Sequence, residues 1–353
     1  MENIIKTRTT IVAGSGEFDK IGITRIRKRC GCSKAAVVML PGSNSDFETS
    51  FLSMAVYLAG QNIDVWGIDF RYSSVPEYSD STPYCQAKSC EFMKNWTTDT
   101  YLSDLDTVVK IAALSSQDEK VFLLGWSQGA FFAYRYAGDH PDLKGVVALD
   151  IAYNLDPALA DIIAKTKAEL LARSEKINQG IYYEDVLTEK YIAYLASTDP
   201  NGSSPVIEGL TNRQAFLFAI TAAYQLPAFS LPNYRYAQGD LNGLKYTDYD
   251  FILQQAFKLN SFQSIYPTTD LYSQWVEPLP SIPDIHVPVM HVGAEYGFGA
   301  FGLYTLEKIK EFNSDVTACL IKDYGHADLV WANAAKHDVW NGITRWLINR
   351  MCD

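Results

Sequence analysis

The sequence predicts an α/β fold, with a mostly parallel central sheet flanked by helices and a large helical lid insertion. Strand and helix patterns alternate over the first 150 residues, which is typical of a parallel sheet covered on both faces. The alternation stops near residue 155 and resumes at residue 287. One sheet interrupted by an insertion is the simplest organisation, so we expect a core domain of residues 1–154 and 285–353 and a lid of residues 155–284.

The individual elements follow from apolar runs and helical spacing. Continuous apolar runs such as residues 35–40 fit strands that are buried on both faces of the sheet. The expected strands are 3–13, 21–30, 35–40, 63–69, 121–124, 146–149, 287–292 and 317–321. The expected helices of the core are 51–60, 99–114, 128–137, 301–312 and 329–349, and those of the lid are 156–177, 183–196, 212–224 and 248–259.

Composition excludes several classes of function. The chain of 353 residues has 41 acidic and 30 basic side chains, and its net charge of −11 disfavours nucleic acid as a partner. No run of 18 apolar residues exists, so we expect no membrane insertion. Gly14-Ser-Gly16 lacks the third glycine of a dinucleotide fingerprint, and no cluster has metal-ligand spacing, so neither a cofactor nor a metal is expected. The oligomeric state stays open.

Among the six cysteines, Cys85 and Cys90 form the best candidate disulfide. They close a short loop in a stretch rich in Ser, Pro and Asp, whereas Cys30 and Cys32 flank one glycine and would be strained if joined. Incidental thiols are the alternative interpretation. A disulfide favours a secreted or periplasmic protein.

A Gly-x-Ser-x-Gly motif, residues 125–129, carries the strongest chemical signal. It directly follows the expected strand 121–124 and opens the helix that begins at Gln128. Its glycines let strand and helix approach each other while the turn presents the Ser127 hydroxyl at the sheet edge. We therefore expect Ser127 to be a nucleophile, the alternative being an ordinary tight turn.

A serine nucleophile needs a base, and His326 is the best of the five histidines. It follows the expected strand 317–321, so it lies at the same sheet edge as Ser127. His291 lies inside an apolar strand and reads as a core residue. His140 ends a surface helix, His286 lies in a loop before a strand, and His337 lies on a mixed face of the last helix, so none of these three is favoured as the base.

Two acids could orient the imidazole. Glu295 follows the penultimate strand and is the favoured candidate, and Asp150, which ends the strand after the nucleophile helix, is the alternative. Asp328, two residues after His326, is expected to brace its loop or start the last helix. Oxyanion donors are expected at the backbone N–H groups of Gln128 and Ser43, with Asn44 as the runner-up to Ser43.

With these motifs the sequence resembles the α/β-hydrolase superfamily. The marks are Leu-Pro-Gly-Ser at residues 40–43, the Ser127 motif, a later acid and Gly325-His326, in the order nucleophile, acid, base. Residues 325–331, Gly-His-Ala-Asp-Leu-Val-Trp, are similar to the end of gastric-type acid lipases. That group has its acid in a Gly-Gly-x-Asp turn, and the turn at residues 292–295 resembles it, which implies Glu295.

The predicted activity is hydrolysis of carboxylic esters through an acyl-enzyme, as in serine esterases and lipases. The lid is rich in aromatic residues, which suits an apolar or aromatic small-molecule ester, although such residues also pack lids onto sheets. The lid aromatics are Tyr182, Tyr183, Tyr191, Tyr194, Phe216, Phe218, Tyr224, Phe229, Tyr234 and Tyr236. A peptidase, amidase or acyltransferase on the same triad is the alternative, and acidic groups such as Glu184, Asp185 and Glu189 would be needed to hold an α-amine. A non-enzymatic binding module is a third hypothesis.

Overall fold

A computed structural model describes residues 3–29, 35–116, 120–221, 235–240, 243–277 and 285–350. Its centre is an eight-stranded sheet with the order β1-β2-β4-β3-β7-β8-β13-β14. The first two strands pair antiparallel, β2 runs antiparallel to β4, and the other six strands run parallel to one another. The strands are β1 (Ile4–Val12), β2 (Lys20–Lys28), β3 (Ala35–Leu40), β4 (Ile63–Asp69), β7 (Phe122–Trp126), β8 (Gly145–Leu149), β13 (Val289–Ala294) and β14 (Val316–Ile321). The predicted mostly parallel sheet is confirmed.

Burial explains the order of the strands. Every residue of β3, β4, β7, β8 and β13 is buried, as their continuous apolar runs predict. Strand β1 at one edge is largely exposed and carries Lys6 and Arg8, whose charges discourage pairing with another chain.

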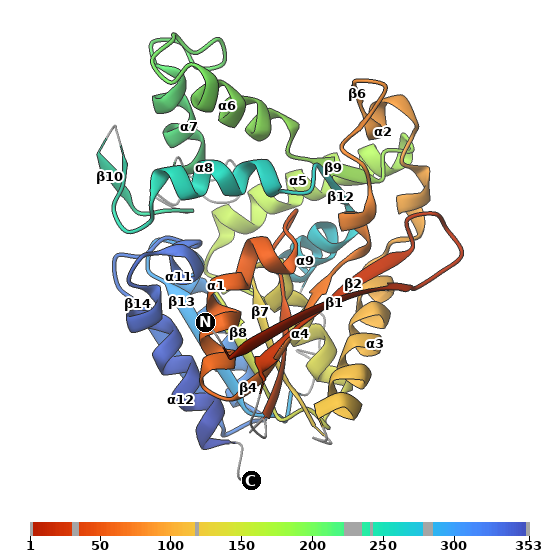
Figure 1. Ribbon diagram of the computed structural model, residues 1–353, viewed down its shortest axis with the longest axis vertical. Coiled ribbons are helices and arrows are strands. Elements are labelled where there is room, and N and C mark those ends of the chain that lie inside the picture. Colours follow the sequence, from red (N-terminus) through yellow and green to blue (C-terminus); the bar gives the residue numbers. More distant parts are fainter. Residues whose placement is uncertain are drawn as a thin grey trace.

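Helices cover both faces of the sheet (Figure 1). One core cluster packs α3, α4 and α10 against the sheet, and the other packs α1 and α12. These helices are α1 (Phe47–Gly60), α3 (Thr98–Ser116), α4 (Gln128–Asp139), α10 (Gly299–Lys310) and α12 (Asn341–Asn349). Helix α1 begins earlier than expected because the side chain of Asp46 caps it, accepting from the Thr49 N–H. The expected helix 329–349 is instead α11 (Asp328–Trp331), a π-helical turn (Lys336–Trp340) and α12.

The segment between β8 and β13, which we call the helical segment, contributes five helices among the described residues. Figure 1 shows α5 to α8 grouped above the sheet. The helices are α5 (Ala160–Asn178), α6 (Leu187–Thr198), α7 (Asn212–Thr221), α8 (Tyr249–Lys258) and α9 (Tyr266–Val276). The expected helix 183–196 starts only at Leu187, because β9 (Tyr183–Asp185) pairs with β12 (Phe262–Ser264). Tyr224, Phe229 and Tyr234 fall outside the described residues.

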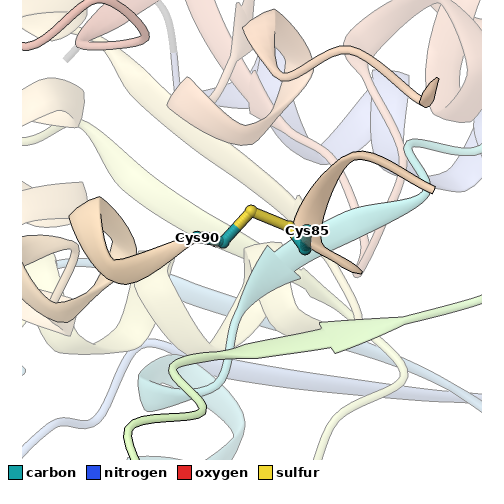
Figure 2. Close-up of a disulfide and its surroundings, with 2 residues drawn as sticks. All are labelled: Cys85 and Cys90. Carbon is teal, nitrogen blue, oxygen red and sulfur yellow. A yellow bond between two sulfur atoms is a disulfide. The ribbon is translucent and has the colours of Figure 1, made fainter. Parts of the chain in front are cut away.

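Cys85 and Cys90 form a disulfide, which confirms the predicted pair. Figure 2 shows the bond joining the short helix α2 (Tyr84–Ala87) to the start of the 3-10 turn Glu91–Asn95. Both cysteines are buried in the core cluster that contains α3 and α4. Cys30 and Cys32 fall outside the described residues. Of the helices that the structure describes, none combines the length and the apolarity needed to cross a bilayer.

Candidate active site

Ser127 occupies the strained turn that the sequence predicts between β7 and α4. Its backbone φ of 56° and ψ of −123° lie in a region that side chains rarely adopt. A Cβ at Gly125 would lie 2.3 Å from the Gly129 carbonyl oxygen, and a Cβ at Gly129 would lie 2.1 Å from the Leu40 carbonyl oxygen. Only glycine fits at either position, so the motif builds the turn by steric necessity.

His326 follows β14 and lies beside Asp150. Its Nδ1 is 2.7 Å from Asp150 Oδ2, and the imidazole is buried, with 5% of the residue exposed. The Trp126 indole stacks on the imidazole at a centroid distance of 5.2 Å, and Phe298 meets it edge-on at 5.6 Å. Since a carboxylate only accepts, Nδ1 carries the hydrogen and the ring is oriented by Asp150 and two aromatic side chains.

Asp150 is held rigidly at the end of β8. Its Oδ1 accepts from the Ala294 N–H at 2.8 Å, and its Oδ2 accepts from the Phe298 N–H at 3.0 Å. The residue is fully buried and its φ is 48°. The last residue of β13 and the turn after it therefore each donate a backbone amide to Asp150, which fixes the carboxylate in front of His326.

Glu295 does not lie beside His326, so the prediction that favours Glu295 as the orienting acid is corrected to the alternative, Asp150. Its side chain is exposed, and its Oε2 accepts from the Asp323 N–H at 2.7 Å. The end of β13 and the turn after it present backbone amides to Asp150, and Glu295 is directed outward. The acid beside the imidazole is Asp150, and the implication drawn from the gastric-type lipase turn fails for this chain.

The loop after β3 lies against Ser127. A Cβ built on Gly42 would be 3.4 Å from Ser127 Cβ, so this glycine permits a close approach of the loop. Ser43 lines the cavity that contains Ser127, as does Gln128, the first residue of α4. The Asn44 N–H donates to Gln263 Oε1 at 2.9 Å, so this amide is already used and the runner-up donor is disfavoured.

A cavity of about 300 Å³ contains Ser127 and His326 at the carboxyl ends of the strands. Aromatic and aliphatic side chains form one part of its wall: Trp126, Ile151, Ile220, Tyr236, Ile252, Leu271, Tyr272, Trp275, Phe298 and Trp331. Charged residues of the helical segment form another part: Arg173, Glu184, Asp185, Glu189 and Arg235. Two ion pairs neutralise most of this charge, Arg173–Glu184 at 2.5 Å and Arg235–Glu189 at 2.7 Å.

The aromatic lining differs in part from the lid residues expected from the sequence. Tyr236 lines the cavity, whereas Tyr191, Tyr194 and Phe218 are exposed. Tyr272 and Trp275 of α9 also line the cavity, and the sequence does not predict them there, because no pattern marks residues 266–276 as a helix at the site.

Asp328 braces the His326 loop, as predicted. It is buried and accepts from the Gly325 N–H at 2.9 Å, the Ala237 N–H at 2.8 Å and the Thr247 hydroxyl at 2.6 Å. Burial raises the pKa of this carboxyl above its usual value, although the three hydrogen bonds oppose that shift. Asp328 thus ties the loop that carries His326 to the helical segment.

His291 is buried in β13, as its apolar neighbours predict, and lies close enough to Asp150 to feel its charge. Burial lowers its pKa from 6.5 to about 4, against the opposing effect of Asp150. Between pH 6.5 and pH 4 the His291 imidazole binds more protons in the unfolded chain than in the folded one. The contribution of His291 to the free energy of unfolding is therefore fully present above pH 6.5 and is lost as the pH falls toward 4.

We therefore expect the variant His291→Leu to have a flatter stability profile than the wild type. Urea unfolding at pH 7 and pH 4.5 should show that the wild type loses about 2 kcal/mol more than the variant. Parallel losses in the two proteins would contradict a buried neutral imidazole at position 291.

Comparisons with known proteins bear on the fold of this chain. A family model described as serine aminopeptidase, S33, matches residues 31–201, and no curated protein sequence matches the chain. A candidate lipase from Sulfolobus solfataricus is similar in structure, with a TM-score of 0.69, 20% identity, and coverage of 99% of this chain and 95% of that one. A carboxyl esterase from Bacillus coagulans in complex with glycerol has a TM-score of 0.60, 15% identity and coverage of 98% and 99%. An epoxide hydrolase from Vigna radiata has a TM-score of 0.53, 15% identity and coverage of 99% of both chains. At these identities the structural similarities establish a shared fold.

Proposed function

We propose that the chain is a member of the α/β-hydrolase superfamily and, within it, a serine hydrolase that cleaves carboxylic esters. The observation that carries the proposal is the 2.7 Å contact of His326 Nδ1 with buried Asp150, in the cavity that Ser127 also lines. An activated serine needs a base oriented by a third group, and we assign Ser127, His326 and Asp150 to these three roles.

In the proposed mechanism the Ser127 hydroxyl attacks the ester carbonyl. His326 accepts the hydroxyl proton at Nε2, because Nδ1 faces Asp150. The imidazolium then protonates the leaving alkoxide, and an alcohol departs as the acyl-enzyme forms. A water molecule, deprotonated by His326, releases the carboxylic acid and restores Ser127. Asp150 keeps the imidazole in place and stabilises its positive charge.

The tetrahedral intermediate carries a negative charge on the former carbonyl oxygen. We propose that the backbone N–H groups of Gln128 and Ser43 bind this oxygen. Gln128 lies at the N-terminus of α4, where the helix dipole also favours negative charge. Gly42 permits the loop after β3 to approach Ser127 closely, and Ser43 of this loop lines the same cavity.

The cavity supports a preference for compact esters with an apolar or aromatic group. Its volume of about 300 Å³ is at the small end of ligand sites, and about half of its lining residues are aromatic or aliphatic. The helical segment would act as the lid of this cavity, and the core would be residues 1–154 and 285–353. The charged part of the wall adds polar contacts that a purely hydrocarbon chain would not use.

An aminopeptidase is the second candidate, because Glu184, Asp185 and Glu189 all line the cavity. Such an enzyme holds the α-amine of its substrate with carboxylates. However, Glu184 is paired with Arg173 and Glu189 with Arg235. An ammonium group would have to displace a guanidinium from either. That leaves Asp185, whose Oδ1 accepts from the Leu187 N–H at 3.2 Å, as a single carboxylate for the amine, so the ester hydrolase ranks first.

Turnover of matched substrates separates these functions. We expect hydrolysis of p-nitrophenyl esters, fastest for short or aromatic acyl groups, and no release of p-nitroaniline from aminoacyl anilides. Acceptor alcohols added to the assay would reveal an acyltransferase by diverting the acyl group from water. Release of p-nitroaniline at rates comparable to ester hydrolysis would favour the aminopeptidase instead.

We also propose that the protein functions in an oxidising compartment, as a secreted or periplasmic protein. The Cys85–Cys90 disulfide supports this location, because such bonds persist outside reducing compartments. Fractionation of the native host, with free-thiol labelling of Cys85 and Cys90, would test it, and reduced cysteines in the cytosolic fraction would contradict it.

A further inference from the structure

Asn44 follows Ser43, the proposed oxyanion donor. The hydrogen bonds that the structure describes for Asn44 all join it to the helical segment. Its N–H donates to Gln263 Oε1 at 2.9 Å, its side-chain Nδ2 donates to the Asn260 carbonyl at 3.0 Å, and its carbonyl accepts from the Asn260 N–H at 2.6 Å. Asn44 is buried, with a left-handed φ of 55°. The conformation of the oxyanion loop therefore depends on residues more than 200 positions away.

We propose that Gln263 is a positioning residue that sets the oxyanion loop from the helical segment. Its Oε1 is the acceptor for the amide that immediately follows Ser43, so it determines how the Ser43–Asn44 peptide is oriented. Gln263 is itself fixed, because it is buried in β12 and its Nε2 donates to Glu184 Oε2 at 3.4 Å. This inference rests on the proposed ester hydrolase function and adds a residue to that site.

The same contacts reach the second proposed donor. Glu184 Oε2 also accepts from the Thr268 hydroxyl at 3.0 Å, and Gln128 Nε2 lies 3.4 Å from Thr268 Oγ1. Arg173 holds the other oxygen of Glu184. One carboxylate of the helical segment is thus linked to Gln128 through Thr268 and to Asn44 through Gln263, which gives both sides of the oxyanion site a common support.

A positioning role predicts an effect on kcat rather than on KM. The negative charge that Gln128 and Ser43 would stabilise exists only in the transition state and the intermediate, so poor alignment of the donors leaves ground-state binding intact. Loss of the hydrogen bond between Gln263 and the buried Asn44 N–H would also let the loop that carries Ser43 move. This movement weakens the Ser43 N–H as an oxyanion donor, because such a donor has to be preorganised.

The test is Gln263→Met, which keeps the side-chain length and removes both hydrogen bonds. We expect kcat for a p-nitrophenyl ester to fall about 10- to 100-fold, less than the loss that follows removal of an oxyanion donor itself, with KM changed by less than about threefold. The rate of Ser127 labelling by diethyl p-nitrophenyl phosphate should fall in parallel. Gln274→Met is the matched control, since Gln274 is another buried glutamine of the helical segment and lies outside the cavity wall; its kcat should stay at the wild-type value.

Thermal melting separates positioning from a structural role. If Gln263→Met lowers the melting temperature but retains wild-type kcat at 25 °C, or raises KM alone, the positioning role is wrong. If that variant does not fold, Gln263→Asn serves instead, because its amide is one methylene too short to reach Asn44, and the same loss of kcat is expected. Failure of the proposed function is distinct: the wild type itself would neither hydrolyse esters nor be labelled at Ser127.

Discussion

Replacement of Ser127 by alanine should lower kcat for ester hydrolysis about 10⁶-fold, the size of loss seen when a serine nucleophile is removed from a complete triad. The variant retains the cavity, His326 and Asp150, but no group remains that can form the acyl-enzyme. Alanine is smaller than serine, so it adds no atoms to the turn between β7 and α4, although it must adopt the same strained backbone conformation. The measurement is steady-state hydrolysis of a short p-nitrophenyl ester, with the melting temperature as a check on folding.

Ser103→Ala is the control for this variant, because Ser103 is exposed on α3 and is not part of the cavity wall. Its kcat should equal that of the wild type. Retention of more than about one thousandth of the activity in Ser127→Ala would contradict a serine nucleophile at this position and would point to direct attack by water.

The second large effect is expected at the acid. Asp150→Asn should lower kcat about 10⁴-fold, because an amide at this position no longer stabilises the imidazolium and can favour the wrong tautomer of His326. Oδ2 of Asp150 is the atom that contacts His326 Nδ1, at 2.7 Å. Glu295→Gln should change kcat by less than about threefold, since this side chain is exposed and bonds only to the backbone of Asp323 in its recorded contacts.

The two variants form a matched pair, because each replaces one carboxylate by its amide. Steady-state kinetics on the same ester, with circular dichroism to compare the folded states, would rank the two acids. A severe loss in Glu295→Gln together with a mild loss in Asp150→Asn would reverse the assignment made from the structure.

The turn at Ser127 and the position of His326 could be predicted because short stretches of sequence carry their patterns. The strained turn at Ser127 depends on Gly125 and Gly129, which lie within the motif itself, and the apolar run before it marks a buried strand. His326 could be placed at the same sheet edge because it lies five residues after the end of a strand. The glycine pattern and the position of His326 after a strand are each visible within a few residues of sequence, so spacing and composition are enough to predict them.

The choice between Glu295 and Asp150 depends on contacts between distant parts of the chain. Strands β8 and β13 are neighbours in the sheet, although the helical segment separates them in sequence. Backbone amides at the end of β13 and in the turn after it then select Asp150 by hydrogen bonds that leave no residue pattern. Both carboxylates follow strands that end at one sheet edge, so the sequence predicts two candidates but not their directions.

Gln263 shows the same limit for the helical segment. It is separated from Asn44 by 219 residues, and an isolated glutamine in a polar stretch has no motif that would indicate its contact. The ion pairs of Glu184 and Glu189 with arginines likewise depend on how α5, α6 and the later loops pack together. These residues could be found only from the folded arrangement.

Intact mass spectrometry after incubation with diethyl p-nitrophenyl phosphate tests the central claim most directly. The reagent phosphorylates an activated serine and releases p-nitrophenol, so the wild type should gain one diethyl phosphoryl group and Ser127→Ala should gain none. Peptide mapping should place the group on Ser127. An unmodified wild-type protein, or equal modification of both proteins, would contradict an activated Ser127 and with it the proposed hydrolase mechanism.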